Sequence, residues 1–373
     1  MKTKARIPIA APLIDEEDKR RVLEVLDSGR LVAGARVRAF EEAFASYLGA
    51  GYAVATSSGT TALQIALEAL EIGPGDAVVT TPFTFVATSN AVLHVGARPV
   101  FVDVDPVTYT LDPNQVEDAL RRERIRAVLC VHLYGLAGHL DALAEIASRH
   151  GVLLVEDAAQ AHGAAVGARK AGTVGAAGIF SFYPSKNMTT GEGGIVVTGD
   201  ESVARAAAVL VNVGQSSSDG YLYERVGYNY RMTEIAAALG IGQLARLEAL
   251  NASRRRHAAR LTQAFAALDW LRAPVEPVGH HHVYNQYTVR VLQDRDGLAR
   301  YLNAQGISTR VYYPHLVPLS PAYRRLGFSG SYPQAEMLAR QVLSLPVHPG
   351  LTPDDLEWII DAVTRYPRDG GRS

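Results

Sequence analysis

Short apolar runs alternate with segments of helical periodicity between residues 52 and 198. Most of the intervening segments, for example residues 61–70 and 141–150, repeat their apolar positions at helical spacing. This alternation is typical of a largely parallel sheet that is covered by helices. We therefore predict an α/β fold with a seven-stranded, mostly parallel sheet and flanking helices. Its strands are expected at residues 52–56, 77–81, 99–103, 126–131, 152–156, 178–182 and 194–198.

The last third of the chain has a different pattern. Residues 283–291 and 308–313 have strand character, and residues 295–305 have helical character. Before them, a long helical stretch at about residues 233–267 contains only two glycines, near its start. We expect this helix to lead from a large α/β domain at residues 1–250 into a smaller α+β domain at residues 251–373.

Composition and charge exclude several classes of function. The 373 residues are 48% hydrophobic and 20% charged, which is enough for a large core, and the net charge is −1. Nucleic acid is an unsuitable partner because phosphate-backbone binding requires clustered Lys and Arg. We expect no membrane association, since no stretch approaches the roughly 20 apolar residues of a spanning helix. The only cysteine, Cys130, cannot form an internal disulfide, so we expect a cytoplasmic location.

Asp157 and Lys186 are the first candidates for chemistry. Asp157 follows one predicted buried strand, and Lys186 follows another, with a glycine-rich loop at residues 190–194 next. The carboxyl ends of such strands usually meet where α/β sheets bind ligands. A lysine amine condenses with a carbonyl, and a buried carboxylate can keep a pyridine nitrogen protonated. Alone, the Asp would be a cap and the Lys a solvated side chain, but together they indicate pyridoxal phosphate.

A phosphate site is predicted just before the helical segment 62–70. Gly59, Thr60 and Thr61 precede that segment, and the first N–H groups of a helix are unsatisfied and positively polarised. Taken alone, these residues would be a simple helix cap. The nearby candidates Asp157 and Lys186 favour the phosphate role.

The chain resembles the DegT/DnrJ/EryC1-type sugar aminotransferases, from about residue 7 to residue 346. The motifs that carry the resemblance are Ser57-Ser-Gly-Thr-Thr-Ala-Leu63, Glu156-Asp-Ala-Ala-Gln-Ala-His-Gly163, Phe180 to Lys186 with Gly191-Glu-Gly-Gly194, and Asn229-Tyr-Arg-Met-Thr-Glu234. The resemblance implies the pyridoxal-phosphate transferase fold of type I, with the cofactor bound as a Schiff base to Lys186. It also implies a homodimer with shared active sites, in which an N-terminal segment of about residues 1–15 packs with the small domain.

The same resemblance implies the substrates and the roles of individual residues. Glutamate would donate the amino group, and a nucleotide-diphosphate 3- or 4-keto-6-deoxy sugar would accept it. The cofactor would be bound by Gly59, the backbone of Thr60 and Thr61, the hydroxyl of Ser181, the ring of Phe85, Gln160, Asp157 and Lys186, and by Asn229 of the neighbouring subunit. For Phe85, core packing by it or by Phe83 is the alternative. The substrate would be bound by Arg231 at the diphosphate, by Tyr312 and Tyr313 at the sugar, and by His162 unless it is a neutral core histidine.

Some positions depart from the family or admit another interpretation. After Pro314, the usual Pro-Leu-His is replaced by residues 315–320, His-Leu-Val-Pro-Leu-Ser, which puts the sugar contact in doubt. Relatives with His in place of Lys186 are dehydratases, so Lys186 argues against dehydration. We expect no metal, and residues 280–282, three consecutive histidines, are interpreted as a solvated loop. The alternatives in function are a pyridoxal enzyme acting on a cyclitol ketone and a non-catalytic regulatory relative.

Overall fold

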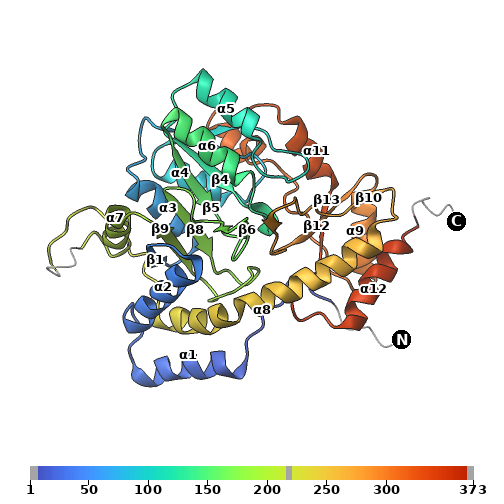
Figure 1. Ribbon diagram of the computed structural model, residues 1–373, viewed down its shortest axis with the longest axis horizontal. Helices are drawn as coiled ribbons and strands as arrows, with labels where there is room; N and C mark the ends of the chain where they lie inside the picture. The colour runs from blue at the N-terminus through green and yellow to red at the C-terminus, as the bar shows by residue number, and fades with distance from the viewer. Residues whose placement is uncertain (1–6, 216–220, 368–373) are drawn as a thin grey trace.

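The computed structural model describes residues 7–215 and 221–367. A seven-stranded sheet with helices on both faces forms its larger part, and a small antiparallel sheet with its own helices forms the rest (Figure 1). The long helix α8 (Glu234–Phe265) runs along both parts. A division of the chain at residue 250 falls inside this helix and stays a prediction.

The larger sheet confirms the predicted fold class. Its strand order is β1-β9-β8-β5-β4-β2-β3. The pairings from β8 through β5, β4 and β2 to β3 are parallel, and only β9 runs antiparallel to its two neighbours. The strands are β1 (Tyr52–Thr56), β2 (Ala77–Thr80), β3 (Arg98–Phe101), β4 (Ala127–Val131), β5 (Leu153–Asp157), β8 (Ala177–Ser181) and β9 (Gly194–Thr198).

Helices cover both faces of this sheet because its strands are apolar on both faces. In β8, Ile179 packs into one core and its neighbour Phe180 into the core on the opposite face. The first core is covered by α3 (Gly59–Ala69), α4 (Ala87–His94) and α7 (Glu201–Val211). The opposite face is covered by α2 (Ala35–Leu48), α5 (Pro113–Arg122), α6 (Leu140–His150) and the start of α8.

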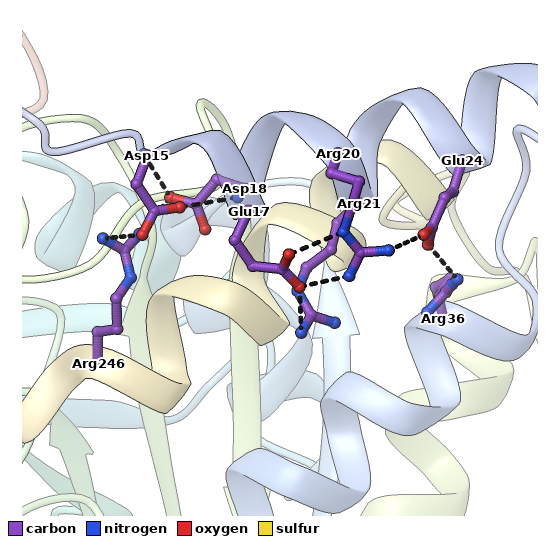
Figure 2. A network of polar contacts seen from close by, with 8 residues as sticks. All are labelled: Asp15, Glu17, Asp18, Arg20, Arg21, Glu24, Arg36 and Arg246. Atoms are coloured by element: carbon purple, nitrogen blue, oxygen red, sulfur yellow. Dashed lines mark hydrogen bonds and ion pairs between the residues drawn. The ribbon is translucent and has the colours of Figure 1, made fainter.

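Two glycines near the start of α8 allow other helices to approach it closely. A Cβ at Gly240 would lie 2.9 Å from the ring of Phe40 in α2. A Cβ at Gly242 would clash with a carboxylate oxygen of Asp18 in α1 (Glu16–Ser28). Figure 2 shows the polar network between these helices, in which the buried Asp18 accepts a hydrogen bond from Arg246 of α8. Glycine at these two positions lowers the helix propensity of α8 but allows α1 and α2 to pack closely against it.

The smaller part is built on the sheet β10-β12-β13. Ile7 joins its core, and the backbone of Ile7 pairs with that of Ile307. The C-terminal half of α8 packs against the same core through Leu261 and Phe265. The elements of this part are β10 (Leu271–Arg272), β12 (Tyr287–Val291), β13 (Val342–Leu345), α9 (Arg295–Ala304) and α12 (Pro353–Thr364).

The remaining elements are short. They are β6 (Ala165–Val166), β7 (Arg169–Lys170), β11 (His280–His281), α10 (Pro321–Arg325), α11 (Pro333–Gln341) and the 3₁₀ turns η1 (Leu133–Gly135) and η2 (Val317–Leu319).

Two local predictions are wrong. Residues 308–313 do not form a strand, because only Arg310 makes a bridge to the neighbouring β13. The histidines at 280–282 are not a solvated loop: His280 and His281 form β11, and His282 is buried against Tyr284. Burial lowers the pKa of His282 to about 3, so its imidazole is neutral. In the described ranges, no helix is long and apolar enough to cross a membrane, and no group of side chains has the makeup of a metal site.

Candidate active site

A cavity of about 590 Å³ lies at the carboxyl edge of the large sheet. Asp157 reaches it from the end of β5, Ser181 from the end of β8, and Gly59 from the start of α3. Parallel strands bring their carboxyl ends to one edge, which explains why residues far apart in sequence meet here. The opposite wall is formed by Gln286, Arg310, Tyr312 and Tyr313.

Asp157 is buried in the wall of the cavity, with an exposed fraction of 5%. Its Oδ1 accepts a hydrogen bond from the Ala159 N–H at 3.1 Å, and its Oδ2 accepts one from the Thr88 hydroxyl at 2.8 Å. Burial raises the pKa of Asp157, whereas these hydrogen bonds and the charge of Lys186 act against that rise. A carboxylate in this setting gains stability from a cation placed beside it, such as a protonated ring nitrogen.

Lys186 lines the same cavity and is half-buried. Burial lowers the pKa of its amine to about 8, although the charge of Asp157 raises it in part. At pH 7 roughly a tenth of the amine is therefore neutral and free to act as a nucleophile or a base, far more than for a free lysine. The structure thus brings together the two residues that the sequence singled out first.

The start of α3 forms the polar end of the cavity. In the described part of the chain, the backbone N–H groups of Gly59 and Thr60 have no acceptor, and both residues line the cavity. A Cβ on Gly59 would lie 2.6 Å from the Cβ of Ser181, so glycine allows the helix start and the end of β8 to meet. Two polarised N–H groups beside a serine hydroxyl suit a phosphate.

The polar groups of Thr61 bond to Ser58, so the role of Thr61 at the cofactor stays a prediction. Its N–H donates to the Ser58 side chain at 3.2 Å, and its hydroxyl accepts from the Ser58 N–H at 3.0 Å. This reciprocal capping box uses the groups of Thr61 that would otherwise face a ligand. Thr61 is also absent from the cavity lining.

Phe85, Gln160 and Tyr313 also line the cavity. Phe85 lines the cavity and is 56% exposed, whereas Phe83 is fully buried in the core, so the two candidate rings have different positions. Gln160 accepts a hydrogen bond from the Tyr134 N–H at 2.8 Å and donates one to the Tyr313 hydroxyl at 3.1 Å. Its amide is thereby fixed, with one N–H still available. Tyr312 lines the cavity beside Tyr313.

His162 lies outside the cavity. It is fully buried, and its ring packs against Phe180 and Phe182 at centroid distances of 5.2 and 5.7 Å. Burial lowers the pKa of His162 to about 3. Of the two alternatives considered for this residue, the structure therefore favours a neutral core histidine over a substrate contact.

Asn229 and Arg231 do not reach the cavity of their own chain. Asn229 is exposed and forms a backbone bridge with Asn212, whose side chain accepts a hydrogen bond from Arg231 at 2.9 Å. Neither residue lines the cavity. The intervening Tyr230 accepts a hydrogen bond from the Ser57 N–H, so the segment runs close to the loop that begins α3.

Glu156, the neighbour of Asp157 in β5, forms a buried hydrogen-bond network with His132. The buried Glu156 accepts hydrogen bonds from His132 Nε2 at 2.8 Å and from the N–H groups of Gly172, Val174 and Gly175. The N–H of Gly138 donates to His132 Nδ1, which leaves the proton on Nε2. Burial raises the pKa of Glu156, but the hydrogen bonds and the electrostatic attraction of His132 lower it by more. The pKa of Glu156 therefore lies below its usual value. This network fixes the strand end from which Asp157 projects.

Several lining residues had no assigned role in the sequence, among them Thr88, Tyr183 and Arg310. Thr88 fixes Asp157, but no pattern distinguishes it from other threonines nearby. Tyr183 and Arg310 line the mouth of the cavity. Tyr183 belongs to a motif that the sequence did single out, whereas Arg310 lies in a segment for which only strand character was predicted.

Comparisons with known proteins agree with this geometry. Residues 12–364 match the model of the DegT/DnrJ/EryC1/StrS aminotransferase family. The chain is 43% identical over 352 residues to dTDP-3-amino-3,4,6-trideoxy-alpha-D-glucose transaminase of Streptomyces venezuelae, covering 94% of this chain and 92% of that protein. It is 39% identical over 370 residues to a pleiotropic regulatory protein of Geobacillus stearothermophilus, covering 96% and 98%.

A solved structure gives the same result. The chain superposes on S. venezuelae DesV, crystallised in complex with a ketimine intermediate, with a TM-score of 0.91 and 42% sequence identity. The match covers 96% of this chain and 98% of that one. Fold and sequence therefore point to the same group of proteins.

Proposed function

This chain belongs to the DegT/DnrJ/EryC1/StrS aminotransferase family, and we propose that it transfers an amino group from L-glutamate to a nucleotide-linked 3- or 4-keto-6-deoxy sugar. The observation that carries the proposal is the meeting of Lys186, Asp157 and the start of α3 in one cavity. The transaminase from Streptomyces venezuelae, which by its name makes a dTDP-linked amino sugar, supports the substrate class.

The residues of the cavity fit pyridoxal phosphate. When bound, this cofactor supplies an aldehyde that takes up the amino group and a ring that withdraws electrons from the reacting carbon. Gly59, Thr60 and Ser181 would hold its phosphate through two N–H groups and a hydroxyl. Asp157 would accept a hydrogen bond from the protonated ring nitrogen, and Lys186 would form the Schiff base.

Phe85 and Gln160 would complete the cofactor site. Phe85 presents an exposed ring to the cavity, suited to stacking, and the second N–H of the Gln160 amide can donate to the phenolic oxygen. The lowered pKa of Lys186 suits proton transfer near neutral pH, because Nζ would take a proton from the substrate carbon that bears the nitrogen and deliver it to the cofactor carbon.

We further propose a homodimer with shared sites. Asn229 would serve the cofactor phosphate of the partner subunit, and Arg231 the diphosphate of its substrate. The exposure of Asn229 and the absence of both residues from their own cavity support this arrangement. Apolar side chains in the same connection, Leu222 and Val226, are 54% and 91% exposed, as expected for a surface that meets a second copy. A reducing cytoplasm would suit the single buried Cys130.

Two measurements test the function. Borohydride reduction of the yellow holoenzyme, followed by peptide mapping, should place the reduced cofactor on Lys186. Lys170 serves as an internal control, because it lies outside the cavity against Tyr47. Recovery of the label on Lys170, or on no lysine, would remove the central assignment.

The second measurement identifies the acceptor. Glutamate is supplied with a panel of dTDP-, UDP- and GDP-linked keto sugars and with a cyclitol ketone, and products are scored by mass. Amination of a nucleotide sugar is expected. Amination of the cyclitol alone would favour the alternative pyridoxal enzyme, and a protein that binds no cofactor would favour the regulatory relative.

A further inference from the structure

Arg310 projects from a fixed backbone at the mouth of the active-site cavity. Its N–H donates to the Ser344 carbonyl at 3.2 Å, and its carbonyl accepts from the Ser344 N–H at 2.7 Å. The segment is therefore attached to β13, while the side chain of Arg310 is exposed and lines the cavity. Among the described residues that line the cavity, it is the one arginine.

The guanidinium of Arg310 has no acidic partner. Within residues 7–215 and 221–367, no carboxylate lies within ion-pair distance of it, and the exposed Glu192 on the same cavity is not paired with it. Its neighbour is a hydroxyl: burial raises the pKa of Tyr312, and the adjacent Arg310 guanidinium lowers it in part. Tyr183, 51% exposed, also lies near Tyr312.

Depth in the cavity separates the anionic groups that Arg310 could bind. The α-carboxylate of glutamate is attached to the reacting carbon, so a site for it must lie as deep as Lys186. The side-chain carboxylate of glutamate can reach further out, but it bears less charge than a diphosphate. In a nucleotide sugar, the width of the sugar ring separates the diphosphate from a reacting carbon at position 3 or 4. An exposed guanidinium at the mouth therefore matches the diphosphate. Its planar fork also suits paired phosphate oxygens.

We propose that Arg310, with the hydroxyls of Tyr312 and Tyr183, binds the diphosphate of the nucleotide sugar from within the same chain. This inference rests on the proposed function and deepens it. It adds an anion site to the one expected from Arg231 of the partner subunit, so each diphosphate would be held from both chains. It also makes Arg310 a residue that distinguishes the sugar acceptor from the amino donor.

Arg310→Ala tests the inference, with Arg310→Lys as a second variant and Arg300→Ala as the matched control. Arg300 is an exposed arginine of α9 outside the cavity, so its loss changes the net charge equally. Binding of UDP, GDP and dTDP to the cofactor-loaded proteins is measured by calorimetry, without turnover. For the nucleotide that wild type binds best, Arg310→Ala should weaken binding roughly ten- to hundredfold.

Arg310→Lys should fall between wild type and Arg310→Ala, because it keeps the charge but loses the fork. The control should bind as wild type does. In separate half-reactions, Arg310→Ala should raise KM for the sugar nucleotide at least tenfold more than it raises KM for glutamate. Equal thermal melting of all variants verifies folding.

Three results would overturn the inference. A loss confined to the glutamate half-reaction would assign Arg310 to the donor carboxylate. Unchanged nucleotide binding in Arg310→Ala, with wild type aminating a nucleotide sugar, would overturn this inference alone. A wild-type holoenzyme that binds no nucleoside diphosphate and aminates no nucleotide sugar would overturn the proposed function along with it.

Discussion

At the scale of single residues, the opposed shifts of Asp157 and Lys186 explain how one cavity can hold a charge and still keep a reactive amine. Burial acts on both groups, raising the pKa of the acid and lowering that of the amine to about 8. Each charge partly offsets the burial cost of the other. A free lysine titrates near 10.4, so the fold shifts the reactivity of this amine toward neutral pH.

The pH dependence of cofactor capture should report this shift. In cofactor-free protein, the rate at which pyridoxal phosphate absorbance appears should rise with pH around a midpoint of about 8, because only the neutral amine condenses. Asp157 raises the pKa of Lys186, so Asp157→Asn should move the midpoint to lower pH. Stopped-flow absorbance between pH 6 and pH 10 measures both. A midpoint near that of a free lysine would show that burial does not control this amine.

Much of the site could be predicted from sequence because its residues lie in short contiguous motifs. Lys186, Asp157, Gln160 and Ser181 line the cavity as expected. The capping box that Thr61 completes with Ser58 could not be predicted, because the sequence does not show which partners its polar groups have. Arg310 was missed because its proximity to the cavity depends on how β13 and the large sheet pack together. His162 could not be decided, because only packing separates a core ring from a ligand contact.

At the scale of elements, the strands of the large sheet were predictable because each is a short run rich in apolar residues, and the strands β2, β4, β8 and β9 are buried throughout. The predicted runs at 52–56 and 194–198 coincide with β1 and β9. The smaller part was less predictable: strand character at 308–313 reflects β-branched and aromatic residues, but the only β-bridge that this segment forms is at Arg310. The sequence pattern does not show whether an extended segment has a neighbouring strand with which it can pair.

The packing of α1 on α8 depends on a buried charge, which gives a prediction for stability. Asp18 is fully buried, and its partner across the interface in Figure 2 is Arg246. Gln243 of α8, which Figure 2 does not draw, also donates to it. Arg246→Ala removes the cation that pairs with this carboxylate and should lower the free energy of unfolding by roughly 2–3 kcal/mol. The loss stays in this range because Gln243 still donates a hydrogen bond to Asp18.

Arg20→Ala provides the matched control on the same helix pair. Its side chain is 57% exposed and pairs with Glu17 and Glu24, so the loss should be below about 1 kcal/mol. Urea unfolding followed by circular dichroism compares the two variants. Equal losses would mean that the buried position of Asp18 contributes nothing beyond a surface ion pair.

At the scale of the whole molecule, the cavity of one chain does not contain all the expected ligand residues. Asn229 and Arg231 lie on a separate segment of the chain, outside that cavity. Asn229 and Arg231 sit on a connection with exposed apolar side chains. An isologous dimer would place each such connection at the partner's cavity, since the same surface is used twice. In the proposed assembly, residues of both subunits therefore form each active site.

Mixed dimers of Lys186→Ala and Asn229→Ala chains test this sharing. If Asn229 serves the partner subunit, a mixed dimer holds one doubly damaged site and one intact site. With random pairing about half the dimers are mixed, so co-expression should restore roughly a quarter of wild-type activity, and the isolated mixed dimer about half. Lys186→Ala mixed with Asp157→Asn is the control, because both lesions lie in the cavity of their own chain and every mixed site keeps one. Activity of the first mixture no higher than the average of its two parents would mean that Asn229 acts within its own chain.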